Sequence, residues 1–313
     1  MAVQGVKRRG KLGRTTEVGY GFCVRRSVVL PDRGKLIVAT DLQGHVNDFD
    51  RVATVFEEAA QGPDGAVLVI TGDLVHGPEL AEEDWPEYLG SFYHGDSVGV
   101  LERALELQSR YPGRVHYLLG NHEHAHIGGP IVAKFFPDEA LRLEDLLGAE
   151  RTLAMREWFK TWPFVALAPQ AGLVMLHAAP HARITSIDEL DALQFDNSNG
   201  LTLEEMAARG TLGALLWART TSSERAWSFL KAIHPDATVA VYGHDVARWG
   251  FAIDREPLLC VSTSFGCFDG DKLYLEWDLA EPAKNALDVA RRGLRPLYPD
   301  APPVHRTDMD ELM

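Results

Sequence analysis

The sequence predicts an α/β sandwich whose sheets are covered by helices. Two observations lead to this fold class: short apolar runs recur along most of the chain, and stretches with helical periodicity separate them. With 313 residues, 46% of them hydrophobic and 24% charged, the chain can bury a substantial core in one large domain or two small ones. Its net charge of −14 argues against a surface that coats nucleic acid, because phosphate backbones are bound by clustered lysines and arginines.

Six apolar runs predict buried strands. They are four to six residues long, rich in β-branched or aliphatic residues, and end in polar turns that often contain glycine. The predicted strands cover residues 36–40, 66–71, 115–119, 173–176, 238–242 and 258–262.

Helices are predicted between these strands. Residues 47–60 place Phe49, Val52 and Phe56 on one face, and residues 97–111 carry a similar apolar stripe. Two further segments of more helical character are expected at about residues 132–160 and 204–217.

The two ends of the chain differ in composition from its centre. Residues 1–30 form a basic arm, and a short apolar stretch at residues 27–30 predicts an edge strand. Residues 281–313 form a C-terminal extension, in which the proline-rich residues 296–303 predict a loosely held tail. The domain between these ends is expected to cover residues 31–280.

Composition also bears on where the protein works. No apolar run is long enough to span a bilayer, and no apolar leader segment follows the basic residues near the N-terminus. Cys23, Cys260 and Cys267 have neither a paired framework nor a CxxC spacing. We therefore expect no membrane association and a reduced, cytoplasmic setting.

Polar residues of the kinds that bind metals stand at the ends of five predicted strands. The clusters read Asp-Leu-Gln-Gly-His, Gly-Asp-Leu-Val-His-Gly, Gly-Asn-His-Glu, a single His, and Gly-His-Asp. Taken one at a time, such an aspartate is usually a turn former and such a histidine a surface residue. Five clusters in order, all at strand ends, favour a shared site. Their residues include Asp41, Gln43, Asp73, His76, Asn121, His122, His177 and His244.

The residue types in these clusters indicate a site for two metal ions. Strands that lie side by side bring the residues at their ends to one rim of the sheet. Oxygen and imidazole ligands suit Mn, Fe or Zn, and two such ions can clamp a phosphoryl group and generate hydroxide. A metal pair needs a bridging carboxylate, for which Asp73 is the natural candidate.

The order of the clusters resembles that of the phosphoprotein phosphatases within the calcineurin-like metallophosphoesterase superfamily. The signatures of that family are GD-x-HG, GD-x-x-DRG and GNHE, followed by separate histidines. The resemblance covers about residues 35–268 and extends to Leu215-Leu216-Trp217, which is similar to the family's Leu-Leu-Trp segment. It implies a two-sheet β-sandwich flanked by helices, and a metallophosphoesterase domain at residues 31–280.

The resemblance also implies roles for individual residues. A metal-bound hydroxide would attack phosphorus directly, and His122 would be the general acid that protonates the leaving oxygen. Arg219 would grip the phosphate, although a surface or salt-bridging arginine is an equally good interpretation. The cofactors would be two divalent ions, with Mn favoured and Fe or Zn as alternatives. Metal 1 would be held by Asp41, Gln43 and Asp73, and metal 2 by Asp73, Asn121, His177 and His244.

Two departures concern the metals and the acid. Gln43 stands where the family has histidine, and its amide oxygen is a weaker ligand that favours a harder ion; His45 and Asp245 are alternative ligands. His76 stands where the family has the acidic residue that orients the catalytic histidine, and the following arginine is missing. His76 could contact phosphate or be a polar loop residue, while Glu123 is a partial replacement for the lost acid.

These features predict a phosphomonoester hydrolase that acts on phosphoserine or phosphothreonine in proteins. The absence of a Gly-His-x-His ending favours this phosphatase branch over the phosphodiesterases. A Gly-Asp-Leu-Val…Gly-Pro ending like that of bacterial dinucleoside-tetraphosphate hydrolases supports an alternative, a dinucleoside polyphosphate hydrolase. A second alternative is a non-catalytic regulator, suggested by Gln43 and the altered second signature. The substrate is thus a phosphorylated protein or small phosphoester, and the sequence leaves the oligomeric state open.

Overall fold

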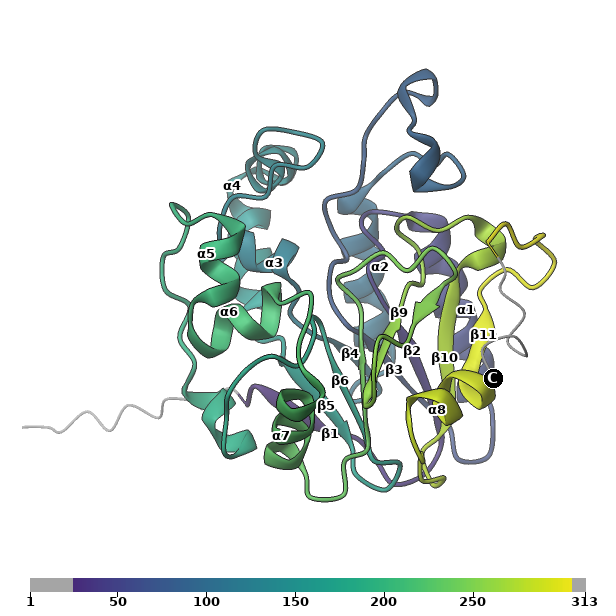
Figure 1. The fold of residues 1–313 in the computed structure, drawn as a ribbon. Coiled ribbons are helices and arrows are strands. Elements are labelled where there is room, and N and C mark those ends of the chain that lie inside the picture. The colour runs from purple at the N-terminus through teal and green to yellow at the C-terminus, as the bar shows by residue number, and fades with distance from the viewer. Residues whose placement is uncertain (1–24, 306–313) are drawn as a thin grey trace, which may run out of the picture.

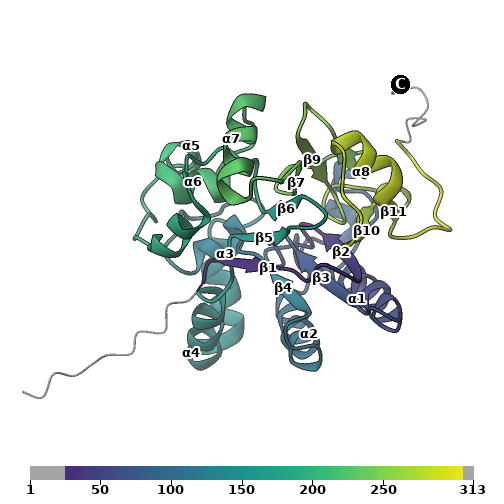
Figure 2. The same cartoon turned by 90° about the horizontal axis from the view of Figure 1, so that it is seen from below.

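The computed structural model describes residues 25–305, which form two β-sheets with helices on their outer sides (Figure 1). The two sheets face each other at the centre of the molecule, and most of the helices lie outside them (Figure 2). The two-sheet sandwich flanked by helices that the sequence predicts is thereby confirmed.

Each sheet mixes parallel and antiparallel pairs. In order across the six-stranded sheet, the strands are β1 (Ser27–Val29), β5 (Val165–Ala168), β6 (Leu173–Leu176), β7 (Val239–Tyr242), β9 (Leu258–Val261) and β8 (Phe251–Ala252). Across the five-stranded sheet they are β11 (Leu294–Pro296), β10 (Leu273–Asp278), β2 (Lys35–Ala39), β3 (Ala66–Ile70) and β4 (Val115–Tyr117).

Most helices cover the outer faces of the two sheets, whereas the helix at Ala286–Gly293 packs against the apolar layer between them. Helices α1, α2 and α4 lie on the side of the five-stranded sheet, and α5, α6 and α7 on the side of the six-stranded sheet (Figure 2). The α-helices are α1 (Val46–Ala60), α2 (Ser97–Arg110), α3 (Asn121–Ala125), α4 (Glu139–Phe159), α5 (Leu203–Ala208), α6 (Gly210–Trp217), α7 (Ser223–Ile233) and α8 (Ala286–Gly293). Single 3-10 turns lie at Glu82–Asp84, Glu87–Leu89, Ile187–Ala192 and Asp269–Asp271.

Alternation along the strands explains how two sheets share a core. In β2, Leu36 and Val38 point into the apolar layer between the sheets, whereas Ile37 and Ala39 pack with the helices outside. All four side chains are buried, so the strand reads as a continuous apolar run, as the sequence shows. Full burial of each large aliphatic side chain contributes roughly 1.5–3 kcal/mol, which fixes the register.

Parallel pairing brings the predicted polar clusters to one rim. Strands β2, β3 and β4 are parallel neighbours in one sheet, and β6, β7 and β9 are parallel neighbours in the other. The carboxyl ends of both sets lie at the same edge of the sandwich, because the backbone N–H of His244, after β7, donates to the carboxylate of Asp41, after β2. All six predicted strands are present, with ends that differ from the prediction by at most two residues.

The helical predictions needed more correction. Residues 132–138 are not helical; helix α4 begins at Glu139, where the carboxylate of Asp138 accepts from the backbone N–H of Leu141, and it is interrupted at Gly148 with φ 73°. The segment expected at residues 204–217 is two helices, because Gly210 has φ 63°. A positive φ suits glycine and ends a helix.

The C-terminal segment is more firmly attached than expected. Pro296, the first residue of the predicted loose tail, ends β11, Leu297 is fully buried, and the hydroxyl of Tyr298 donates to the carboxylate of Asp48 at 2.7 Å. For the described part of the tail the expectation was therefore wrong. The predicted edge strand at residues 27–30 is present as β1, while the basic residues 1–24 of the arm lie outside the described range. In residues 25–305, no helix is both long and apolar enough to cross a membrane.

Candidate metal centre

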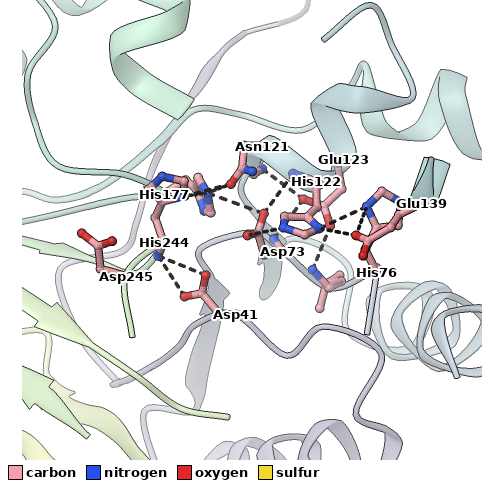
Figure 3. A network of polar contacts seen from close by, with 12 residues as sticks. Asp41, Asp73, His76, Asn121, His122, Glu123, Glu139, His177, His244 and Asp245 are labelled. Carbon is pink, nitrogen blue, oxygen red and sulfur yellow. Dashed lines mark hydrogen bonds and ion pairs between the residues drawn. The ribbon is translucent and has the colours of Figure 1, made fainter. Parts of the chain in front are cut away.

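The predicted ligands from the two sheets meet at the shared rim of the sandwich (Figure 3). Asp41 and Asp73 follow β2 and β3, and Asn121 begins α3 after β4. His177 and His244 follow β6 and β7 in the other sheet. The site therefore lies on the seam between the sheets, where it depends on both.

Backbone strain is concentrated at this site. Among residues 25–305, the non-glycine residues with positive φ are Asp41, Gln43, Asp73, His76 and His244. Such conformations cost roughly 1–3 kcal/mol each and persist where the surrounding structure enforces them. Every one of these residues was singled out from the sequence as a ligand or phosphate contact, so the strain marks a functional site.

Asn121, His177 and His244 aim acceptor atoms at one point. The Nδ1–H of His177 donates to the carbonyl oxygen of Thr71 at 2.9 Å, so a neutral His177 presents a lone pair on Nε2. That atom lies 2.7 Å from Oδ1 of Asn121 and 3.1 Å from Nδ1 of His244. Two acceptor atoms that face each other are stabilised by a cation between them. Ligand atoms bound at about 2.1 Å to one metal ion lie about 3 Å from each other.

Asp73 completes this group. Its Oδ1 lies 3.5 Å from Nε2 of His177, and Asp73, His177 and His244 place one ligand atom each within 4.8 Å of one another. Together with Asn121, these three residues are the set that the family resemblance implies for metal 2. The residues fit a divalent ion.

The set expected for metal 1 lies beside it. The backbone N–H of Gln43 donates to the carbonyl oxygen of Asp73 at 2.8 Å, which holds the two loops together. Oε1 of Gln43 is buried and has no hydrogen-bond partner among the described residues. Orphaned buried acceptors are costly, and a bound cation would satisfy them.

Small residues let the carboxylates approach. A Cβ atom at Gly243 would lie 2.1 Å from Oδ2 of Asp41, and one at Gly120 would lie 2.3 Å from Oδ1 of Asp73. Neither distance is possible for a real side chain, so both positions require glycine while the carboxylates keep these places.

The carboxylates are electrostatically unbalanced without a cation. Burial raises the pKa of Asp41, and the neighbouring Asp73 raises it further. Burial also raises the pKa of Asp73 itself. Divalent ions at this position would offset the desolvation of both groups.

Glu123 supports the loops rather than His122. Its carboxylate accepts from the backbone N–H groups of Asp73 at 2.9 Å, Leu74 at 2.8 Å and Gly120 at 3.1 Å. These bonds tie the loop after β3 to the start of α3. The suggestion that Glu123 replaces the lost orienting acid is therefore not supported by its contacts.

His122 has one ring nitrogen towards the metal ligands and the other towards His76. Its Nε2 lies 3.7 Å from Oδ2 of Asp73, and its Nδ1 lies 3.1 Å from Nδ1 of His76. The second nitrogen of His76 is 2.9 Å from Nε2 of His126. His76 is thus buried behind His122 and is not among the residues that line the cavity over the ligands, so the expected phosphate contact lacks support.

The cavity over the ligands has a volume of about 260 Å³ and carries two cations. Arg219 lies at its edge and is paired with Asp245, which places Asp245 in an ion pair rather than on a metal. Lys134 also lines the cavity, and its Nζ lies 3.5 Å from the ring centre of Phe265. Although part of the Lys134 side chain is exposed, burial lowers its pKa to about 8, against the attraction of Asp73.

Sequence reasoning missed Lys134 and Glu139. Both lie at the start of the segment that was expected to be helical, where neither has a motif around it. His76, His122 and Glu139 form a second group of possible metal ligands, which differs from the expected metal 1 set. His45 caps the N-terminus of α1, where its Nδ1 accepts from the backbone N–H of Asp48. It is not among the residues that line the cavity.

Comparisons with known proteins identify the family and agree with this fold. Residues 34–260 match the family model of the calcineurin-like phosphoesterases. A comparison with curated protein sequences gives no match.

Two of the solved structures that are similar to the chain have TM-scores above 0.5, and at their identities they show the fold alone. A protein serine/threonine phosphatase from Saccharomyces cerevisiae has 16% identity and a TM-score of 0.52, over 80% of this chain and 75% of that chain. A cold-active protein-tyrosine phosphatase from a psychrophilic Shewanella species has 16% identity and a TM-score of 0.51, over 80% and 76%. Because the family model spans most of the chain and includes every strand-end cluster, the chain belongs to the calcineurin-like phosphoesterase family and is a metal-dependent phosphoester hydrolase.

Proposed function

We propose that the chain is a dinuclear-metal phosphomonoester hydrolase, and more narrowly a serine/threonine protein phosphatase. One observation carries the proposal: a buried acceptor atom without a partner, Oε1 of Gln43, lies with the carboxylates of Asp41 and Asp73 in a cavity that is also lined by the cations Lys134 and Arg219. Such a cavity fits a phosphate dianion. Divalent ions bound there would supply Lewis-acid activation of the phosphoryl group and of the attacking water.

Each residue has a role in this proposal. Asp41, Gln43 and Asp73 hold metal 1, and Asp73, Asn121, His177 and His244 hold metal 2. Lys134 and Arg219 bind the phosphoryl oxygens from the rim. His122 places Nε2 on the side of the metal ligands, where it donates a proton to the leaving oxygen.

Manganese is the proposed native metal. Gln43 offers an amide oxygen where imidazole would favour a softer ion, and Asp41 and Asp73 add carboxylate oxygens. Oxygen-rich ligand sets suit Mn²⁺ better than Zn²⁺, while the imidazoles of His177 and His244 keep Fe and Zn as alternatives.

A phosphorylated side chain is the proposed substrate because it matches the size of the cavity. Its volume of about 260 Å³ suits one phosphoryl group and the side chain that carries it. A dinucleoside polyphosphate would extend well beyond such a cavity and would need further contacts for its bases.

The test is a metal-by-substrate screen on metal-free protein reconstituted with Mn, Fe, Zn, Mg, Ni or Co. We expect Mn-dependent hydrolysis of para-nitrophenyl phosphate, and faster hydrolysis of phosphoserine or phosphothreonine peptides than of diadenosine tetraphosphate. The reverse ranking would make the chain a nucleotide hydrolase. Fewer than two bound metals at saturation, together with no turnover, would favour a non-catalytic regulator.

A further inference from the structure

A continuous chain of hydrogen bonds runs from His122 away from the cavity to helix α4. Nδ1 of His122 meets Nδ1 of His76 at 3.1 Å, and Nε2 of His76 meets Nε2 of His126 at 2.9 Å. Nδ1 of His126 lies 2.8 Å from Oε1 of Glu144. Figure 3 shows the beginning of this chain, with His76 behind His122.

Arg156 anchors the far end. Its guanidinium donates to both carboxylate oxygens of Glu144, from Nε at 3.1 Å and from Nη2 at 2.6 Å. Glu144 and Arg156 both belong to α4, and they approach each other across the interruption at Gly148. The three imidazoles are almost completely buried, so each hydrogen bond is shielded from water.

The direction of every hydrogen bond in this chain follows from the carboxylate. Glu144 only accepts, so Nδ1 of His126 carries the hydrogen and its Nε2 has the lone pair. Nε2 of His76 must then donate, which leaves a lone pair on its Nδ1. Burial lowers the pKa of His76 and of His126, which keeps both rings neutral. Each hydrogen bond in the chain then has one direction only.

The next hydrogen bond, between His76 and His122, determines the tautomer of His122. The lone pair on Nδ1 of His76 accepts Nδ1–H of His122, so Nε2 of His122 is the nitrogen left to exchange a proton beside Asp73. His76 thereby acts as an acceptor, as a directly attached carboxylate would.

Other buried carboxylates nearby do not make this contact. Oε2 of Glu139 lies 3.8 Å from Nδ1 of both His76 and His122, beyond hydrogen-bond range, and its Oε1 accepts from the backbone N–H of Phe135. Glu123 is used by backbone N–H groups. Among the residues that the structure describes, Glu144 is the carboxylate that is connected to the Nδ1 side of His122 by hydrogen bonds.

We propose that Glu144 is a positioning residue that acts through His126 and His76 to fix the tautomer and orientation of His122. This inference rests on the proposed function of His122 as general acid. It assigns the task of the missing acidic residue at position 76 to a carboxylate two imidazoles away, on a different helix.

The leaving group of the substrate provides the specific readout. Phenyl phosphate needs a proton on its leaving oxygen, whereas 2,4-dinitrophenyl phosphate does not. In Glu144→Gln, the amide N–H can donate to His126 while Arg156 keeps the amide oxygen, which reverses every bond in the chain. We expect kcat for phenyl phosphate to fall about tenfold, with an unchanged KM, and kcat for 2,4-dinitrophenyl phosphate to change less than twofold.

The matched control is Glu102→Gln. Glu102 forms an exposed ion pair with Arg151 of α4, at 2.6 Å, and belongs to no hydrogen-bond chain to the cavity. This variant removes a carboxylate–guanidinium pair of the same kind and is expected to leave both rates unchanged. Equal losses with both substrates in Glu144→Gln would overturn the proposal and make Glu144 a merely structural residue.

A second variant tests the pathway. His76→Asp places a carboxylate beside Nδ1 of His122, so Glu144→Gln should cost nothing further with phenyl phosphate in that background. A full tenfold loss in the double variant would show that Glu144 does not act through His76.

A third measurement separates this inference from the proposed function and does not depend on activity. In metal-free protein with ¹⁵N-labelled histidine, we expect Nδ1–H on His122 and His126, Nε2–H on His76, and the opposite tautomers in Glu144→Gln. Unchanged tautomers would overturn the proposal. The proposal would also be overturned if the wild type bound a third metal ion and Glu139→Gln did not. Nδ1 of His76 and Nδ1 of His122 would then hold a cation between them and would share no hydrogen bond. Inactivity of the wild type with every metal would remove the proposed function alone.

Discussion

The backbone N–H of His244 donates to both carboxylate oxygens of Asp41 at 3.0 Å, which links residues that lie 203 positions apart. Asp41 follows a strand of the five-stranded sheet and His244 a strand of the six-stranded sheet. Both residues have positive φ, so the contact holds two strained turns against each other. The metal centre and the seam between the sheets are therefore parts of one structure, and changes at the ligands should alter stability as well as activity.

Asp73→Asn should separate these two effects. The asparagine oxygen can still accept from the backbone N–H of His122, as Oδ1 of Asp73 does at 3.1 Å, but the buried negative charge is gone. In the presence of a chelator, we expect the free energy of unfolding of the variant to be about 1 kcal/mol higher than that of the wild type. Denaturant titration measures this difference.

The same variant should lose its response to metal. A ligand at one hundred times its Kd stabilises the folded wild type by about 2.7 kcal/mol, and Asp73→Asn should gain little of this. Asp64→Asn, at an exposed position, is the control and should respond to metal like the wild type. If Asp73→Asn were stabilised by Mn as strongly as the wild type, Asp73 would not be a bridging ligand.

Gln43→His should raise affinity for zinc. Imidazole is a stronger ligand for Zn²⁺ than an amide oxygen, so we expect the Kd of the weaker zinc site to fall about tenfold in competition with a chromophoric chelator. His45→Gln tests the alternative ligand. Because Nδ1 of His45 accepts from the backbone N–H of Asp48, that variant should lower helix stability and leave metal affinity unchanged. Weaker metal binding in His45→Gln would contradict the assignment of Gln43.

Lys134→Met should weaken phosphate binding. The Lys134 ammonium group interacts with Asp73 and Asp41 and lines the cavity, where it would meet the oxygens of a bound phosphoryl group. We expect KM for para-nitrophenyl phosphate and the inhibition constant of inorganic phosphate to rise about tenfold together, corresponding to one charge-assisted hydrogen bond. Lys284→Met, at an exposed position, is the matched control. A fall in kcat with both binding constants unchanged would place Lys134 in a different role.

The sequence was sufficient for features that are local. Strands such as β2 and β3 can be predicted from their apolar residues, and a polar cluster directly follows each strand in the sequence. Asp41, Asp73 and Asn121 could therefore be predicted as one set. The family resemblance added the order of these clusters along the chain. That His244 contacts Asp41 depends on how two sheets face each other, which no local pattern encodes.

Contacts between separate loops and helices could not be predicted from local sequence patterns. His76 and His126 are 50 residues apart, and His126 and Glu144 are 18 apart, so their contacts require the docking of α3 against α4. The tail was misjudged for a similar reason. Proline content favours an irregular chain, but Leu297 fills the core and Tyr298 bonds to Asp48, and these tertiary contacts outweigh local composition.

Glu139→Gln should change how stability depends on pH. Oε2 of Glu139 is buried without a hydrogen-bond partner, and burial raises its pKa from 4.5 to about 7. Between these values the folded state holds the proton more tightly than the unfolded state, so stability is lost as pH rises from about 4.5 through about 7. Above pH 7 the wild type carries a destabilising buried charge that glutamine lacks.

We therefore expect Glu139→Gln to match the wild type at pH 4.5 and to exceed its free energy of unfolding by up to about 3 kcal/mol at pH 8, in the presence of a chelator. Urea titration at the two pH values measures this difference. Glu150→Gln, which replaces an exposed glutamate of the same helix, should show no such difference. An equal offset at both pH values would mean that the packing of the amide, rather than the charge of Glu139, changes stability.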